Sequence, residues 1–415
     1  MKPTRCFEYV GDKLYCEGVS LSSAADRFGT PCYIYSMEAI CRNLKILKDS
    51  FPAEYAYICF AVKANSNLSI LELLASQGIG FDIVSGGELY RLRRLGVSGS
   101  RIIFSGVGKR LDEIDWAIRT GVFSLGVESL EELEMIAGRA EALLTAVMVS
   151  LRLNLDVETE THPGISTGRK EHKFGLDTVF LPEASMFIKN HPLLRLKGIG
   201  SHIGSQIMDS APYITAFERL LSCASDLKSS GFNIEFLDVG GGFGIPYDDD
   251  TGPFRLAEFA EYISKNRGPY RIVLEPGRFI VGSAGVLVSR VTLTKTTGGR
   301  KFLVLDAGMN DLMRPALYQA RHQILPEGNT SRNTVTVDIV GPICETTDRF
   351  AENLSIPALK NGDLVAIMEA GAYGSVLSSN YNSRGRPAEI MVCGEEMRLI
   401  RKRESNEDLI SDEII

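Results

Sequence analysis

The chain has 415 residues, of which 44% are hydrophobic and 23% charged, and its mean hydropathy is +0.02. These values are typical of a globular protein with a large core, and the length is typical of two or three domains. The formal net charge of −7 argues against nucleic acid or an anionic membrane as the main partner. We expect a cytoplasmic protein, because no apolar run is long enough for a membrane span and MKPTRCFEYVGD lacks the apolar core of a secretory signal.

The eight cysteines are scattered along the chain and form no Cys-x-x-Cys pair, and the five histidines form no zinc-like cluster with them. We therefore expect no metal site. Most of the cysteines are expected to be reduced core residues, as in a reducing compartment. Cys344 is the exception and is discussed below.

Short β-rich segments alternate with helix-like stretches over the first two thirds of the chain. The predicted strands cover residues 55–61, 79–84, 101–105, 122–127, 146–153, 196–202, 234–239 and 271–275. The predicted helices cover residues 37–49, 68–77, 85–95, 110–120, 129–140, 178–189, 212–229 and 256–266. This alternation predicts a parallel sheet, and eight strands predict closure into a (β/α)8 barrel. The alternative, an open doubly wound sheet, normally has a Gly-x-Gly-x-x-Gly turn after its first strand, and ICFAVKANSNLS has none.

After about residue 283 the helix signals nearly vanish. Strand-like segments follow at residues 285–295, 301–306, 334–340, 363–368 and 388–393. We therefore expect a barrel over residues 35–282 and a C-terminal all-β domain of Greek-key type, with an acidic tail, over residues 283–415. The N-terminal segment, residues 1–34, contains a predicted hairpin in CFEYVGDKLYCEG and is expected to pack with the β domain.

Polar residues stand where the predicted barrel strands end, and this is where barrel active sites lie. The first strand runs into Lys63, whose burial without a partner would be costly. The sixth ends in SHIGS, with His202 and Ser205, and the eighth in LEPGR. The seventh runs into DVGGGFG, whose triple glycine is either a plain turn or a nest of amides for an anion. Its place after strand seven favours a phosphate site.

A lysine, a carboxylate, a histidine and a phosphate cradle at one barrel mouth predict pyridoxal phosphate as the cofactor. This cofactor needs a lysine for a Schiff base and a carboxylate that keeps its ring nitrogen protonated. Glu275 suits the ring nitrogen, and His202 suits the ring face. An ion pair between Glu275 and Arg278, or a hydrogen-bonded core histidine at position 202, would each explain one residue. Neither alternative explains why all these residues stand at strand ends.

Nine motifs resemble, in the same order, those of the diaminopimelate decarboxylases, pyridoxal phosphate enzymes of the alanine-racemase-like group. They are FAVKAN, FDIVSGGEL, HKFGL, SHIGSQI, LDVGGGFGIPY, LEPGR, DAGMNDLMRPALY, VGPICETTD and GAYGSVLSSNYNSR. The resemblance runs from about residue 5 to residue 400. FAVKAN and EPGR fit ornithine and arginine decarboxylases as well, whereas GMNDLMRPALY, PICET and SSNYNSR are more particular to the diaminopimelate branch.

The resemblance implies cofactor roles for the barrel residues. Lys63 is similar to the Schiff-base lysine of the family, and His202 to the histidine that packs on the pyridine ring. The phosphate and ring contacts of the family resemble Ser205, Gly240, Gly241, Gly242, Glu275, Pro276, Gly277 and Arg278.

The resemblance also implies substrate roles. Arg278, Arg314 and Tyr318 resemble residues that hold the far end of the substrate, where a guanidinium suits a carboxylate. Glu345 is similar to the residue that meets the substrate ammonium, and Tyr373 to a cofactor and substrate contact. Without the resemblance, Arg314, Tyr318 and Tyr373 would be interpreted as structural.

Cys344 resembles the proton donor of the family. A thiol can be tuned toward working pH by its neighbours, whereas the other cysteines are expected to be inert. In the family, the loop that carries this cysteine reaches into the barrel of a second subunit. The resemblance therefore implies a homodimer with shared sites and a small amino acid as the ligand.

The reaction implied is decarboxylation of meso-2,6-diaminopimelate to L-lysine and CO2, the last step of lysine biosynthesis. One alternative is a decarboxylase of the same fold that acts on ornithine, arginine, carboxynorspermidine or a carrier-bound amino acid. Arg314 discriminates, because an enzyme that forms a diamine has no distal carboxylate to bind. A racemase would need a second acid or base at the opposite ring face. A non-catalytic regulatory protein would have lost Lys63, Cys344 or Glu275, and the chain keeps all three.

Overall fold

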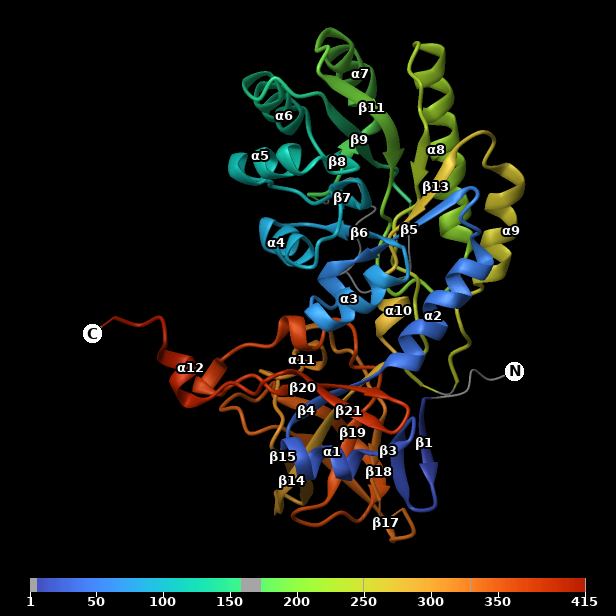
Figure 1. Ribbon diagram of the computed structural model, residues 1–415. Coiled ribbons are helices and arrows are strands. Elements are labelled where there is room, and N and C mark those ends of the chain that lie inside the picture. The colour runs from blue at the N-terminus through green and yellow to red at the C-terminus, as the bar shows by residue number, and fades with distance from the viewer. Residues whose placement is uncertain (1–5, 158–172, 249, 329, 415) are drawn as a thin grey trace. The chain divides into compact units, whose positions relative to one another are not determined.

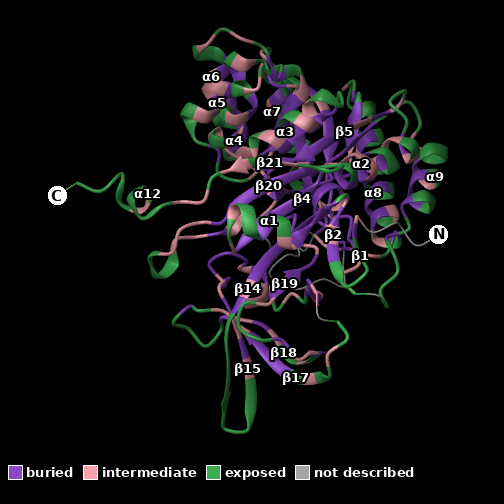
Figure 2. Cartoon of the chain, turned by 60° about the horizontal axis from the view of Figure 1, so that its bottom comes forward, coloured by how far each residue is buried: buried purple, intermediate pink, exposed green. Residues whose placement is uncertain are grey.

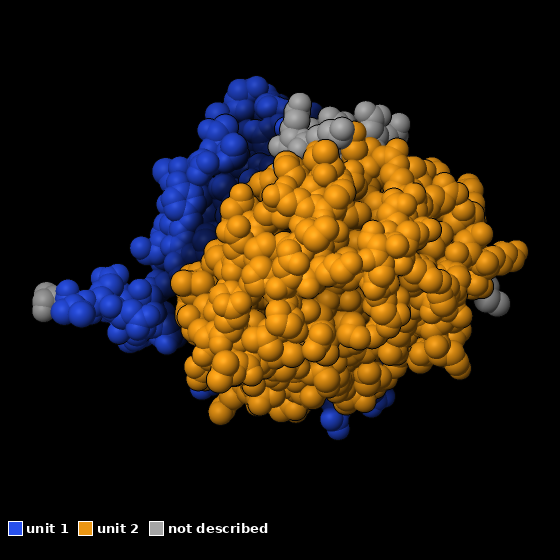
Figure 3. All heavy atoms as spheres, turned by 90° about the horizontal axis from the view of Figure 1, so that it is seen from above, with its two compact units in different colours: residues 1–44, 246–252, 280–415 blue, residues 45–245, 253–279 orange. Residues whose placement is uncertain are grey.

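The computed structural model describes the whole chain except residues 1–5, 158–172, 249, 329 and 415. His172, the first residue of the HKFGL motif, lies outside the described residues. The chain forms two compact units (Figure 3): unit 1 comprises residues 1–44, 246–252 and 280–415, and unit 2 comprises residues 45–245 and 253–279. Within the described residues, no helix combines the length and the apolar character that a membrane crossing requires.

Unit 2 is a closed barrel of parallel strands (Figure 1). Its ring consists of β5 (Ala56–Ala61), β6 (Gly80–Ile83), β7 (Ile102–Phe104), β8 (Ser124–Val127), β9 (Val147–Asn154), β11 (Leu194–Gly200), β12 (Phe236–Asp238) and β13 (Arg271–Leu274). The ring closes where β13 pairs with β5, with Val273 opposite Tyr57. A short strand, β10 (Leu176–Asp177), lies beside β9. The predicted barrel is confirmed, and each predicted strand overlaps an observed one.

Helices alternate with the barrel strands in the predicted order, starting with α2 before β5. They are α2 (Met37–Ser50), α3 (Leu68–Ser76), α4 (Gly86–Arg94), α5 (Leu111–Thr120), α6 (Leu130–Ala142), α7 (Leu181–Asn190), α8 (Ala211–Ser229) and α9 (Leu256–Asn266). Side chains cap several of them directly after a strand end. Ser85 accepts a hydrogen bond from the Glu88 amide at the start of α4, and Ser129 does the same for the Glu132 amide of α6. These caps fix short strand-to-helix turns at the barrel mouth.

Aromatic and aliphatic side chains fill the N-terminal part of the barrel. Cys59, Ile103, Phe236 and Val273 form a buried cluster, with Tyr57 and Phe123 packed against it. Phe236 fits only because residue 198 is glycine, since a Cβ there would lie 2.2 Å from the phenyl ring. The N-terminal end of the barrel is therefore apolar, and the C-terminal strand ends are left for polar residues.

Unit 1 is built on a mixed sheet with the strand order β18-β17-β15-β14-β4-β20-β21. The strands are β4 (Cys32–Ser36), β14 (Gly285–Thr297), β15 (Arg300–Leu305), β17 (Thr334–Val340), β18 (Arg349–Pro357), β20 (Ala388–Cys393) and β21 (Glu396–Arg401). Two more strands, β16 (Ile324–Pro326) and β19 (Leu364–Ile367), pair with each other, and β19 also pairs with β14. The C-terminal part of β14, residues 292–297, is exposed (Figure 2).

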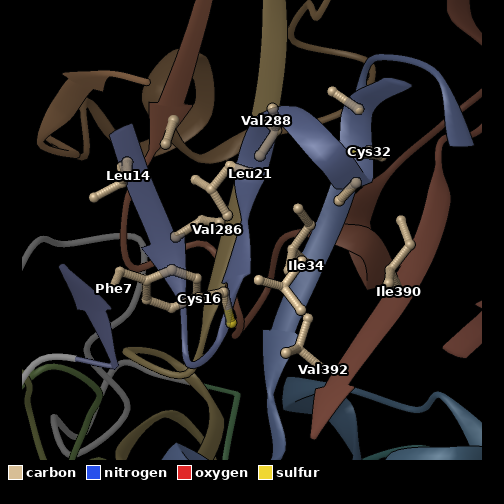
Figure 4. Close-up of a cluster of buried hydrophobic side chains, with 14 of the residues drawn as sticks. Phe7, Leu14, Cys16, Leu21, Cys32, Ile34, Val286, Val288, Ile390 and Val392 are labelled. Carbon is tan, nitrogen blue, oxygen red and sulfur yellow. The ribbon is translucent and has the colours of Figure 1, made fainter. Parts of the chain in front are cut away.

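The N-terminal segment joins this β region, as predicted, but through a different strand. β4 pairs with both β14 and β20 and is buried throughout. The predicted hairpin is present as β1 (Phe7–Val10) and β2 (Lys13–Cys16), but it forms a small separate sheet with β3 (Val19–Ser20). That sheet and α1 (Leu21–Phe28) pack on the main sheet, because Phe7, Leu14 and Leu21 share one hydrophobic cluster with Ile34 and Val286 (Figure 4).

Candidate active site

Lys63 lies in a single 3-10 turn, Val62–Ala64, directly after β5. Its Nζ donates to Oδ2 of Asp82 at 3.0 Å, and Asp82 belongs to the neighbouring strand β6. The Asp82 side chain is fully buried, whereas 35% of the Lys63 side chain is exposed. The ammonium is therefore held at the barrel mouth by a carboxylate that cannot move into solvent.

Glu275 follows β13 and lies close to Lys63 because the next residues approach the β5 end. The Pro276 carbonyl accepts from the Ala61 amide at 3.1 Å. Gly277 allows this approach, since a Cβ there would lie 2.8 Å from the Ala64 Cβ. Glu275 is buried and accepts from the Ser105 hydroxyl.

Glu275 shares its surroundings with a second carboxylate, Asp238, at the end of β12. Burial raises the pKa of Glu275 well above its usual range, and the negative charges of Asp238 and Asp82 add to the effect. Burial likewise raises the pKa of Asp238 to about 7. The barrel mouth thus holds more buried carboxyl groups than Lys63 can pair, and a bound cation would favour their charged forms.

His202 and the triple glycine form one hydrogen-bonded unit. The Gly241 amide donates to His202 Nδ1 at 3.2 Å, so Nδ1 carries no proton. Burial lowers the pKa of His202 well below its usual range, and the charges of Lys63 and Arg152 lower it further. The imidazole is therefore neutral and has its proton on Nε2.

The glycine run packs tightly against its neighbours. A Cβ at Gly241 would lie 1.9 Å from the Glu275 carbonyl oxygen, and one at Gly242 would lie 2.0 Å from the Gly204 carbonyl oxygen. The Gly240 amide donates to Asp238 at 2.8 Å, and the Gly241 amide is taken by His202. The amides of Gly240 and Gly241, two of the three expected to form an anion nest, thus have partners in the protein. Close backbone packing explains why residues 241 and 242 are glycines.

Ser205 and Arg278 lie together, since Arg278 NH2 donates to the Ser205 hydroxyl at 3.0 Å. Arg278 is buried at the start of the short helix α10 (Arg278–Val281). A buried guanidinium next to a hydroxyl is a suitable donor set for a phosphate or a carboxylate.

Charged residues that the sequence analysis did not identify complete the cavity. It is lined by Lys63, Ser105, Glu128, Ser150, Arg152, His202, Asp238 and Glu275, among others. Arg152, on β9, pairs with Glu128 at 2.9 Å, and Glu128 also accepts from the Gly175 amide. The Glu128 amide donates to Glu132, and Glu132 pairs with the buried Lys109 at 2.8 Å. This ion-pair network fixes the orientation of Arg152 in the cavity.

The donor set fits pyridoxal phosphate. Lys63 presents an amine, the Glu275 and Asp238 pair suits a cationic ring nitrogen, and the neutral His202 suits a ring face. Asp82 Oδ1 is buried and has no hydrogen-bond partner among the described residues, so the mouth retains unused acceptor capacity. The described residues contain no group of three or more His, Cys, Asp or Glu that could hold a metal ion.

Unit 1 carries the predicted substrate residues other than Arg278, which belongs to unit 2. Arg314 and Tyr318 are the first and last residues of α11 (Arg314–Tyr318). Arg314 is buried, at 4% exposure, and donates to His322 at 2.8 Å. Tyr373 is half-buried, and its φ of +56° is uncommon for an aromatic residue, which is a pattern often found at functional sites.

Cys344 and Glu345 lie in an exposed loop between β17 and β18. Asp348 holds this loop, because its two carboxylate oxygens accept from the amides of Met309 at 2.7 Å and Ile343 at 2.6 Å. The Cys344 amide donates to the Asn382 side chain at 2.9 Å. Asn382 belongs to the SSNYNSR motif, so two predicted motifs meet at the cysteine.

A lysine, a carboxylate and a neutral histidine at a barrel mouth indicate a pyridoxal phosphate enzyme, and the family match identifies the class as pyridoxal-dependent decarboxylases. Residues 37–282 match the family described as "Pyridoxal-dependent decarboxylase, pyridoxal binding domain". The match confirms pyridoxal phosphate as the cofactor.

Full-length relatives narrow the class. A diaminopimelate decarboxylase of Neisseria meningitidis serogroup B is 45% identical over 97% of both chains. The solved diaminopimelate decarboxylase of Helicobacter pylori complexed with L-lysine aligns with a TM-score of 0.90 at 39% identity, and the alignment covers 94% of this chain and 98% of that chain. The solved enzyme of M. jannaschii in complex with L-lysine aligns with a TM-score of 0.93 at 35% identity, and that alignment covers 99% of this chain and 98% of that chain. The chain belongs to the diaminopimelate decarboxylase family, as the sequence motifs predicted.

Proposed function

We propose that this protein removes one carboxylate of meso-2,6-diaminopimelate as CO2 and yields L-lysine, the last step of lysine biosynthesis. The observation that carries the proposal is the 45% identity to a diaminopimelate decarboxylase over 97% of the chain. The unit 2 cavity, which joins Lys63, His202 and Glu275, supports it.

Pyridoxal phosphate, when bound, supplies a sink for the electrons left behind when the bond to the departing carboxylate breaks. Lys63 would hold the cofactor through its amine, which Asp82 orients. Ser205, Gly242 and Arg278 hold the phosphate, because the amides of Gly240 and Gly241 are already engaged. Pro276 and Gly277 keep this segment against the β5 end.

Glu275 and His202 set the electrostatics of the ring. Glu275 would stabilise a protonated ring nitrogen of the bound cofactor. A cation there would also offset the repulsion from Asp238 and Asp82, which adds to the effect of burial in raising the pKa of Glu275. His202 stays neutral, so it covers the ring face without opposing the positive charge.

The residues of unit 1 recognise the rest of the substrate. Arg314 and Tyr318 bind the far amino-acid group, in which the guanidinium pairs with the distal carboxylate, and Arg278 contributes to the same recognition. Glu345 meets the distal ammonium, and Tyr373 contacts both cofactor and substrate.

Cys344 delivers a proton from Sγ to the carbon that has lost its carboxylate. Its exposed loop belongs to the active site of a second copy, so the protein acts as a homodimer with shared sites. The loop is firmly held by Asp348 and Asn382, which suits a residue that must place a thiol accurately. The cytoplasmic location expected from the sequence stays a prediction.

The substrate is tested by incubating the pure protein and pyridoxal phosphate with equal amounts of meso-diaminopimelate, ornithine and arginine. We expect CO2 and lysine to accumulate together while ornithine and arginine persist. Turnover of either without lysine would refute the substrate assignment. Absence of all turnover in a protein that binds the cofactor would favour a regulatory homologue.

Shared sites are tested by mixing inactive Lys63→Ala and Cys344→Ala proteins. If subunits exchange, hybrid dimers contain one intact site and activity returns to about a quarter of the wild-type value, as random pairing predicts. Mass-tagged subunits monitor the exchange. Complete exchange without recovery would show that each subunit supplies its own cysteine.

A further inference from the structure

Arg314 is held in unit 1 by a chain of hydrogen bonds that starts at the backbone. Arg314 NH1 lies 2.8 Å from Nε2 of His322, and Nδ1 of His322 lies 2.7 Å from the Met368 carbonyl oxygen. Arg314 and His322 are 4% and 6% exposed. Met368 follows β19, so this series of hydrogen bonds links α11 to the C-terminal end of β19.

These two distances determine the protonation of His322. A carbonyl oxygen only accepts, so Nδ1 must carry a proton and donate to it. A guanidinium only donates, so Nε2 must present its lone pair to Arg314. The neutral tautomer with its proton on Nδ1 satisfies both bonds, and a doubly protonated imidazole would face the guanidinium with a second N–H. His322 is therefore a neutral acceptor for Arg314.

A tyrosine from a distant part of the sequence completes this arrangement. The Arg314 guanidinium carbon lies 4.8 Å from the ring centroid of Tyr247, and the Tyr247 and His322 rings meet edge to face at 5.1 Å. Tyr247 is the last residue of the LDVGGGFGIPY motif and lies in the stretch 246–252 that belongs to unit 1. An aromatic face attracts a cation and limits its orientations.

We propose that His322 and Tyr247 are positioning residues that hold the Arg314 guanidinium for the distal carboxylate, and thereby set the preference for ligands that carry it. The inference rests on the proposed function, because that function assigns Arg314 to this carboxylate. A guanidinium binds a carboxylate well only when its planar fork is correctly oriented. A histidine bond in its plane and an aromatic ring over its face together fix that plane.

Two ligands separate recognition of the carboxylate from general damage. L-lysine has a carboxylate at one end, and 1,5-diaminopentane is the same chain without it. Both are titrated into the holoenzyme through changes in cofactor absorbance, which needs no turnover. The variants are His322→Leu, which removes both hydrogen bonds, His322→Gln, which has an acceptor and a donor at a similar reach, and Tyr247→Leu.

We expect His322→Leu and Tyr247→Leu to weaken L-lysine binding and raise KM for meso-diaminopimelate by roughly 10- to 100-fold, with 1,5-diaminopentane within about twofold of wild type. His322→Gln should recover much of the loss. The matched control is His191→Leu, because His191 Nδ1 also donates to a backbone carbonyl, that of Phe187, but His191 lies at the end of α7. It should leave both ligands unchanged.

Equal weakening of both ligands would overturn the proposal, since it would indicate general disruption. Unchanged L-lysine binding in both leucine variants would overturn it as well. Thermal unfolding of each holoenzyme checks that the variants fold, and Tyr247→Leu provides an independent test if His322→Leu does not. A wild type that makes no lysine from meso-diaminopimelate, yet prefers L-lysine to 1,5-diaminopentane, would refute the proposed function while leaving the positioning role intact.

Discussion

Replacing Gly241 with alanine tests whether the glycine run is required for tight backbone packing at the barrel mouth. The added Cβ would lie 1.9 Å from the carbonyl oxygen of Glu275 and 2.7 Å from its carbon. The loops after β12 and β13 must then separate by more than about 1 Å, because an ordinary contact needs roughly 3.5 Å. Such overpacking costs about 1–3 kcal/mol, and here the opposing group is rigid backbone.

The separation also breaks contacts that set the site. The Gly241 amide donates to His202 at 3.2 Å, and the Glu275 amide donates to Gly240 at 2.8 Å. We therefore expect Gly241→Ala to bind pyridoxal phosphate about 10- to 100-fold more weakly, the equivalent of about 1.4–2.8 kcal/mol. Thermal unfolding of the cofactor-free protein should also show a lower midpoint.

Gly138→Ala is the matched control for this substitution. Gly138 lies inside α6, and an added Cβ there meets no atom within 4 Å. Alanine in a helix interior is favoured by roughly 0.5–1 kcal/mol over glycine, so this variant should be slightly more stable, with unchanged cofactor affinity. Wild-type affinity and midpoint in Gly241→Ala would refute the steric reasoning.

Three further predictions concern other parts of the chain. Asp348→Asn removes one of the carboxylate acceptors that hold the loop of Cys344, so kcat should fall about 10-fold or more while cofactor absorbance is unchanged. An unaltered kcat would contradict the role of Asp348 in holding this loop. Lys109→Met leaves the buried Glu132 charge unpaired and should destabilise by about 3–5 kcal/mol, whereas the double variant with Glu132→Gln should be more stable than the single one in urea unfolding. Burial raises the pKa of Asp311 to about 7, above its unfolded value, so its contribution to stability is complete at low pH and is lost as pH rises through 7. Asp311→Asn should therefore make the fall in unfolding free energy between pH 5 and 6 shallower by about 1.4 kcal/mol per pH unit, and an unchanged slope would oppose this interpretation.

Local patterns in the sequence were sufficient to predict the barrel. Each strand is a short apolar run followed by a turn and an amphipathic helix, and the caps at Ser85 and Ser129 are set by neighbouring residues. The pairing of β4 could not be predicted in this way. CYIYS is too short to be distinctive, and its partners β14 and β20 lie more than 200 residues away in sequence.

The lining of the unit 2 cavity was predictable where a residue stands at a strand end, as Lys63, His202 and Glu275 do. The sequence interpretation missed four charged residues, Asp82, Glu128, Arg152 and Asp238. The same rule, that polar residues near the ends of apolar barrel strands face the site, would have identified them. His322 and Tyr247 gave no local signal, since their role depends on contact with Arg314 across the fold of unit 1.

The most direct test of the account is to locate the cofactor on the chain. The purified holoenzyme is reduced with borohydride, digested and analysed by mass spectrometry, with Lys63→Ala as the comparison. The account predicts a pyridoxyl-phosphate adduct on Lys63 in the wild type and no stoichiometric adduct in the variant. An adduct on a different lysine, or the same labelling in Lys63→Ala, would contradict the central claim that the lysine after β5 holds the cofactor.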